Sequence, residues 1–147
     1  DAIAAVNRLI PDTRTYGLLK DLRFAVRGGR VPRWVKTIAD LLRATAMIRT
    51  VPDGRVASGT FLFGRKNRIK RFARYVAKRT PAADSLDVAI GHAVCHEDAV
   101  ELERELRSHF GNIHRTTITD IGAALGVHGG PGTLIVATQP YSRPDGS

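Results

Sequence analysis

The chain has 147 residues, of which 43% are hydrophobic and 25% are charged, a composition ordinary for one globular domain with its own core. Its single cysteine, Cys95, excludes an internal disulfide, and no apolar run reaches the roughly 18 residues that a membrane-spanning helix needs. With 23 Lys and Arg against 14 Asp and Glu, the formal net charge of +9 is compatible with a nucleic acid, an anionic membrane surface or an acidic protein as partner. We therefore expect a single domain over residues 1–147, without a membrane span and in the cytoplasm.

In the first half of the chain, apolar spacing and turn signals predict two helices and three short strands. The segment 15–19 is ambiguous, because Leu18, Leu19 and Leu22 also suit the start of a helix. Pro52-Asp53-Gly54 is a turn signal between two strand-like segments and predicts a hairpin. The expected helices are 2–10 and 35–46, and the expected strands are 15–19, 46–51 and 55–63.

The second half of the chain alternates between helices and strands, beginning with a basic amphipathic helix over 66–78. Its apolar residues follow the spacing of one helix face: Ile69, Phe72, Ala73 and Val76. No internal repeat and no linker divides the chain into two domains. Further strands are expected over 87–94, 113–118 and 133–138, and further helices over 98–110 and 121–127.

One histidine precedes a glycine-rich run between the last expected helix and the last strand. Gly129, Gly130 and Gly132 can adopt backbone angles closed to other residues, and Pro131 removes one backbone donor. Such a run can leave N–H groups free to face an anion, with His128 beside them to donate, accept or carry charge. The pattern suits a carboxylate or a phosphate. The alternative is a loop that only needs tight turns, with His128 bonded to the backbone.

Two other clusters are weaker candidates. His92, Cys95 and His96 follow a strand, but their spacing matches no common zinc site and no further cysteine completes four ligands, so we expect no metal. The segment 65–79 holds eight Lys or Arg and no acid. A solvated helix face is its simplest explanation, and docking to an acidic protein comes next. Nucleic acid comes third, because the chain lacks a helix-turn-helix pattern and interleaved aromatics.

The motifs, taken in order, resemble the C-terminal half of the DegV family of bacterial fatty-acid-binding proteins. That family carries a Leu-rich segment ending in Gly-Gly-Arg, here 22–30, and then an Asp-Gly turn, here 53–54. A basic helix follows, and Gly-x-His-x-Gly-Pro-Gly stands before a strand near the end, here 126–132. The match covers nearly all of the chain, although Val31-Pro32 replaces the family's usual Ile-Ser.

This resemblance implies an α/β (α+β) fold: a two-layer domain with a mixed sheet of about six strands covered by helices. It also implies an N-terminal domain that is absent from this chain. In the family the fatty acid is held between the two domains, and the histidine of the Gly-Pro-Gly motif, here His128, contributes to the carboxylate site. We expect Gly129, Gly130 and Gly132 to bind the ligand beside it.

In the family a separate fatty acid kinase makes an acyl phosphate from the bound acid. A basic residue near the start of the basic helix serves that docking, and here Arg65 and Arg68 both compete for the role. The family usually shows an Arg a few residues before a Lys-Ala pair, a pattern that this segment departs from.

We therefore expect a lipid-binding module, and not an enzyme by itself. With its missing N-terminal domain it binds a long-chain fatty acid and presents it to the kinase, without a cofactor and without nucleic acid. Leu, Ile and Val of the helices over 35–46 and 121–127 are expected to line an apolar tunnel. Two alternatives stay open: a dihydroxyacetone-binding domain related to kinases whose histidine holds the substrate covalently, and a basic nucleic-acid-binding module.

Overall fold

The computed structural model describes residues 2–29, 31–51, 54–64 and 66–141. Within these ranges six strands form one sheet in the order β3-β2-β1-β6-β4-β5. The strands are β1 (Arg14–Leu19), β2 (Ala44–Thr50), β3 (Val56–Phe63), β4 (Leu86–His92), β5 (Ile113–Asp120) and β6 (Leu134–Pro140). The helices are α1 (Ala2–Leu9), the short 3-10 helix η1 (Ile10–Asp12), α2 (Leu22–Arg27), α3 (Arg33–Leu41), α4 (Arg68–Arg79), α5 (His96–His109) and α6 (Gly122–Gly129).

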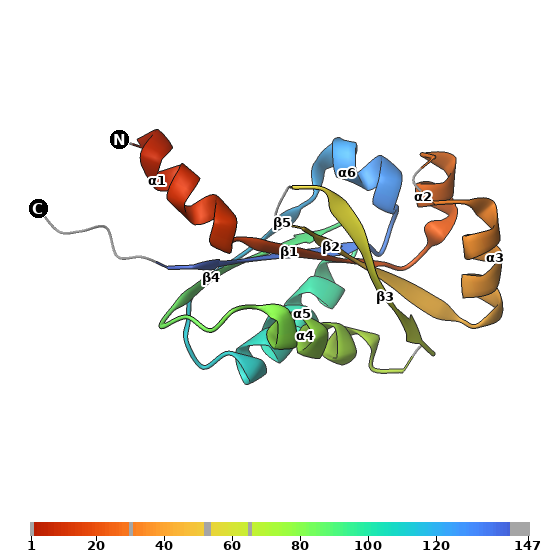
Figure 1. Cartoon of the computed structure of the whole chain (residues 1–147). Coiled ribbons are helices and arrows are strands. Elements are labelled where there is room, and N and C mark those ends of the chain that lie inside the picture. The colour runs from red at the N-terminus through yellow and green to blue at the C-terminus, as the bar shows by residue number, and fades with distance from the viewer. Residues whose placement is uncertain (1, 30, 52–53, 65, 142–147) are drawn as a thin grey trace, which may run out of the picture.

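The sheet is mixed, because β4 and β5 run parallel while the other neighbouring pairs are antiparallel. Figure 1 shows α4 and α5 together beneath the sheet, α2 and α6 above it, and α3 at one end. The predicted α/β domain, with a mixed sheet of about six strands covered by helices, is confirmed.

The main core lies between the sheet and the helices α4 and α5. Alternate residues of the central strands belong to this core, as the two-residue period of a strand requires. Its fully buried members are Leu18, Phe72, Ala73, Val76, Ile90, Ala99, Leu102, Leu106, Leu134 and Val136. A smaller cluster joins β1 and β2 to α2 and α3: Leu19, Leu22, Ala25, Ala39 and Ala46.

The helix expected over 35–46 ends at Leu41 instead. Arg43 has a positive φ of 49°, a left-handed conformation that a continuing helix does not allow. Ala44 already pairs with Phe63 in the β2–β3 ladder. Sheet pairing therefore overrides the helical spacing of apolar residues in this segment.

The ambiguous segment near Leu18 resolves into a strand followed by a helix. β1 continues to Leu19, and α2 begins at Leu22. Asp21 caps α2, because its carboxylate accepts a hydrogen bond of 2.8 Å from the N–H of Arg23. The cap explains why helix and strand meet here within three residues.

The predicted hairpin is confirmed by the antiparallel pairing of β2 with β3, in which Thr50 lies opposite Val56. Pro52 and Asp53 of its turn lie outside the described residues. Other boundaries shift by a few residues; β4 ends at His92, and Val94 beyond it has a positive φ of 52°. Of the helices in the described ranges, none has the length and apolar character that crossing a bilayer would take.

Candidate functional site

His128 lies in the last turn of α6, on the face of the sheet opposite α4 and α5 (Figure 1). Its imidazole packs against Gly28 at the end of α2, so closely that a Cβ built on Gly28 would stand 2.3 Å from Nδ1 of His128. The Gly-Gly-Arg segment and the His-containing segment, a hundred positions apart in the sequence, therefore meet at one point. Arg30 lies outside the described residues.

Nδ1 of His128 is buried and has no hydrogen-bond partner among the described residues. The whole side chain is half-buried, so one edge of the ring faces the packed backbone and another remains accessible. Buried polar atoms in folded proteins are nearly always paired. The absence of a bond at Nδ1 argues against the alternative in which this nitrogen bonds to the backbone, and the edge of the ring away from Gly28 is the part that an incoming group can reach.

The glycines after His128 serve close packing. Gly129 lies against Thr133, and a Cβ built on it would stand 2.8 Å from the Thr133 hydroxyl oxygen. Gly130 has a φ of 73° and lies against the ring of Phe24, with 2.2 Å between a built Cβ and Cδ2. Gly132 has a φ of 83° and lies against the side chain of Lys20. Larger residues would push α2 and its flanking segment away from the loop.

The expectation of free N–H groups in this run is wrong for two of its glycines. The N–H of Gly130 donates to the carbonyl of Gly126 at 2.8 Å, and the N–H of Gly132 donates to the carbonyl of Ala93 at 2.8 Å. The first bond closes the C-terminus of α6, and the second ties the loop to the segment after β4. The side chain of His128 is therefore the available polar group of the motif.

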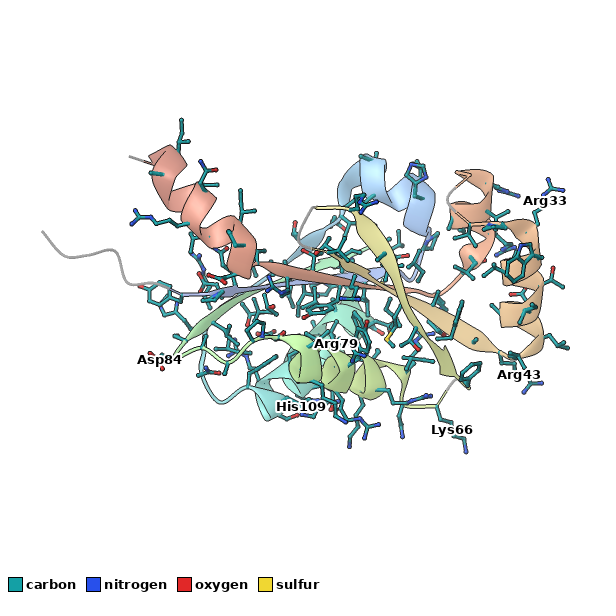
Figure 2. All side chains as sticks on the ribbon, in the orientation of Figure 1. Arg33, Arg43, Lys66, Arg79, Asp84 and His109 are labelled. Carbon is teal, nitrogen blue, oxygen red and sulfur yellow. The ribbon has the colours of Figure 1, made fainter. Side chains whose placement is uncertain are left out.

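A hollow of about 940 Å³, which we call the glycine-loop hollow, opens beside Pro131 and Gly132. Phe24 both lines this hollow and contacts Gly130 of the loop that follows His128. Arg43, at the end of the α3 segment in Figure 2, also lines it. Its charged residues are Lys20, Asp21, Arg23, Lys36, Asp40, Arg43 and Arg68.

Arg68 lines the glycine-loop hollow and is held in place within the domain. Its guanidinium donates to the carboxylate of Asp98 at 2.7 Å, and both side chains are less than a third exposed. Arg68 therefore joins the start of α4 to the start of α5 instead of projecting freely. Arg65, the other candidate for partner docking, lies outside the described residues.

The other chemistry-bearing cluster follows β4. Nε2 of His92 lies 3.3 Å from Nδ1 of His96, and Nδ1 of His92 lies 3.4 Å from a carboxylate oxygen of Asp120. Burial raises the pKa of the neighbouring Cys95 thiol, which favours the protonated form of the sulfur. In the part of the chain that the structure describes, no group of three or more His, Cys, Asp or Glu is placed to hold a metal ion.

Sequence reasoning singled out the histidine and the glycines but did not predict which residues in and beside α2 lie against them. Gly28, Phe24 and Lys20 fill the space around the loop, and their contacts follow from the fold and not from any local pattern. The one available signal is Gly28 itself. Its φ of −78° is open to any residue, so the glycine is explained by the close approach of another side chain and not by backbone conformation.

The comparison with known sequences agrees with this arrangement of motifs. The family model of DegV, described as "Uncharacterised protein, DegV family", matches residues 1–140. A DegV domain-containing protein of Clostridium perfringens is 29% identical over 139 residues, which is 95% of this chain and 49% of that protein. The chain thus spans about half the length of the curated relatives that it matches.

Solved structures show the same fold. The fatty acid binding DegV family protein from Streptococcus agalactiae matches with a TM-score of 0.77 at 22% identity, over 95% of this chain and 49% of that one. The Streptococcus pneumoniae fatty acid kinase (Fak) B3 protein, loaded with linoleic acid, matches with a TM-score of 0.79 at 14% identity, over 95% of this chain and 48% of that one. At these identities the likeness concerns the fold.

Proposed function

The chain belongs to the DegV family, and on that premise we propose that it supplies one wall of a binding site for a long-chain fatty acid, in a cytoplasmic protein. It binds and presents the acid and does not catalyse a reaction by itself. The observation that carries this proposal is the half-buried ring of His128: its Nδ1 edge packs against Gly28 without a hydrogen-bond partner among the described residues, and its other edge stays accessible.

A carboxylate is the partner that the accessible edge of this ring suits best. Imidazole donates an N–H to a carboxylate oxygen in its neutral form and in its charged form. Gly28 leaves the ring its space, and we propose that Gly129, Gly130 and Gly132 hold the loop beside the ligand.

The relatives support the class of ligand. The Streptococcus agalactiae protein is named as fatty acid binding, and the Streptococcus pneumoniae protein holds linoleic acid. Both share the fold of this chain over nearly its whole length, and each is about twice as long. We propose that the full-length protein containing this chain completes the site with its other half.

The acyl chain requires apolar surface, and α6 and α3 offer it. Leu125 and Val127 of α6 are 56% and 62% exposed, and Leu41 of α3 is 82% exposed. Clustered exposed apolar side chains mark surfaces that a ligand or another part of the protein covers. Val35, in contrast, packs on the smaller core. We propose that the acyl chain and the other half of the protein cover the exposed set.

We further propose that the bound acid is presented to a separate fatty acid kinase, and that Arg65 and Arg68 contribute to docking that partner. Support comes from the name of the Streptococcus pneumoniae neighbour, a fatty acid kinase B protein. The position of Arg68 beside the glycine-loop hollow adds to it, because that hollow lies next to the loop that follows His128.

The experiment is mass spectrometry of lipid that copurifies with the full-length protein, followed by calorimetry with fatty acids of increasing length. We expect a long-chain acid in the purified protein. Affinity should rise by about 0.8 kcal/mol for each added CH₂ that is buried. Equal affinity for short and long acids would contradict the proposal. Binding of dihydroxyacetone or of DNA in place of a lipid would instead support the two alternatives stated from the sequence.

A further inference from the structure

A second hollow of about 740 Å³, which we call the arginine hollow, lies at the C-terminal end of α4. It is on the opposite face of the sheet from α6 and His128, since α4 and α6 cover opposite faces (Figure 1). Figure 2 shows Arg79 at the end of α4, close to the sheet. The residues that matter to its chemistry are Arg14, Tyr16, Arg49, Thr50, Tyr75 and Arg79.

Strand register brings two of the arginines to the same side of the sheet. Tyr16 of β1 lies directly opposite Arg49 of β2 in the antiparallel ladder, so their side chains leave the sheet on one face. Arg14 precedes Tyr16 by two residues and shares that face. Tyr16 is only 3% exposed. Its ring packs edge to face against the ring of Tyr75, with 6.0 Å between the ring centroids. The two tyrosines form an ordered floor beneath the arginines.

Two of the three guanidinium groups around this floor, those of Arg79 and Arg14, are held in place without being neutralised. The guanidinium of Arg79 stacks over the ring of Tyr75, 3.9 Å from its centroid. Nη1 of Arg14 donates to the carbonyls of Pro11 and Thr13 at 2.6 and 3.0 Å. Neither contact supplies a negative charge, so both groups keep their full positive charge at the hollow.

Acidic groups are missing from the described lining of the arginine hollow. None of Arg14, Arg49 and Arg79 forms an ion pair with a described residue. The glycine-loop hollow differs, because three of its cations, Arg23, Lys36 and Arg68, are paired with carboxylates. Uncompensated like charges gathered at one concave site repel one another and attract an anion.

We propose that the arginine hollow binds a small, multiply charged phosphorylated anion. Three guanidinium groups match two or more negative charges, and each presents a planar fork that fits phosphoryl oxygens. The hydroxyl oxygen of Thr50 accepts the N–H of Thr15 at 3.2 Å, which leaves its own O–H to donate to such a ligand. The volume of the hollow accommodates a ligand of nucleotide size.

The test uses the full-length protein and calorimetric titration with inorganic pyrophosphate, with orthophosphate, citrate and a short DNA oligonucleotide as comparisons. Arg49→Gln and Arg79→Gln each remove one guanidinium from the hollow. Arg74→Gln is the matched control, because Arg74 is exposed on the same helix, does not line the hollow and changes the net charge equally. Melting temperatures without ligand verify that each variant folds.

We expect one saturable site for pyrophosphate, tighter than orthophosphate and citrate. Arg49→Gln and Arg79→Gln should each weaken it about tenfold or more, as the loss of a hydrogen bond to a charged group does. Arg79→Lys should fall between wild type and Arg79→Gln, because it keeps the charge but loses the planar fork. All variants should retain fatty-acid binding, which separates this site from that of His128.

Three results would overturn the proposal. The first is the absence of saturable pyrophosphate binding, including the case in which only the oligonucleotide binds. The second is equal weakening by Arg74→Gln, which would assign the binding to diffuse surface charge. The third is citrate binding as tightly as pyrophosphate, which would remove the phosphoryl preference.

Discussion

His128 and Gly28 are in direct contact across two helices, with 2.3 Å between Nδ1 of the imidazole and the place where a Cβ on Gly28 would stand. The contact fixes one edge of the ring against the end of α2. The rest of the ring, at the end of α6, stays only half-buried. The identity of residue 28 thereby controls the position of the histidine on which the proposed carboxylate site depends.

Gly28→Ala should therefore weaken fatty-acid binding. The added methyl group cannot coexist with the imidazole at its present position, so His128 must move, while the ordinary φ of residue 28 puts no strain on the backbone. We expect a loss approaching that of His128→Ala and a small change in melting temperature, measured by calorimetry and thermal unfolding of the full-length protein.

Gly29→Ala is the matched control for this variant. Gly29 has a φ of 70° and no atom within 4 Å of a built Cβ, so alanine there strains the backbone without touching the histidine. It should lower stability by about 1–2 kcal/mol and leave binding per folded molecule unchanged. The contact between residue 28 and His128 would be irrelevant to binding if the two variants behaved alike.

Gly130→Ala should destabilise the fold more than Gly122→Ala. Both residues have positive φ values, 73° and 59°, but a Cβ on Gly130 would overlap the ring of Phe24 whereas one on Gly122 meets nothing within 4 Å. Gly122→Ala should cost the backbone strain alone, about 1–2 kcal/mol. Chemical denaturation measures the loss of unfolding free energy in both variants, and the difference between them is the steric cost at Gly130. Equal losses would rule out tight packing of α2 on the loop.

Arg65→Glu combined with Arg68→Glu should abolish stimulation of the kinase partner and leave fatty-acid binding nearly intact. Asp98→Asn isolates the ion pair, because it leaves the charge of Arg68 in place and removes its partner at 2.7 Å. We expect Asp98→Asn to retain stimulation. Loss of lipid binding in the double variant, measured by calorimetry, would place the arginines in the ligand site instead.

Stability in acid should depend on Asp21. Burial acts to raise the pKa of this carboxyl, but hydrogen bonds from the backbone and side chain of Arg23 outweigh it and lower the pKa below its usual 3.8. A carboxylate with a lowered pKa stabilises the fold above that usual value, and its contribution is lost as the pH falls through the lowered pKa. Denaturation from pH 7 to pH 2 should show a smaller acid-induced loss for Asp21→Asn than for wild type.

The charge-matched control for this variant is Asp84→Asn, which removes an exposed carboxylate. We expect its acid-induced loss of stability to match that of wild type. An unchanged loss in Asp21→Asn as well would mean that the cap of α2 contributes nothing to the pH dependence.

Most of the order of elements was predictable because the apolar periods are strong, as along α4, where Ile69 and Phe72 are both buried. The helix α2 was expected only as an alternative to the strand before it. The end of α3 was not predictable, because Leu42 continues the helical spacing of apolar residues. The pairing of β2 with β3 instead sets the backbone conformation after Arg43. His128 could be singled out by its place before the glycines. The hydrogen bonds donated by the Gly130 and Gly132 N–H groups could not be predicted, because their acceptors depend on how α6 ends and on Ala93, a residue far away in the sequence.

The central claim is that His128 binds the carboxylate of a fatty acid, and calorimetry of the full-length His128→Ala variant with a long-chain acid tests it most directly. His109→Ala is the matched control, because His109 also lies in the last turn of a helix and is exposed (Figure 2). Loss of a hydrogen bond to a charged group, about 1.5–3 kcal/mol, predicts affinity weaker by about ten- to a hundredfold for His128→Ala, with little change in melting temperature. Unchanged affinity together with a lowered melting temperature would show that His128 is structural and would contradict the account.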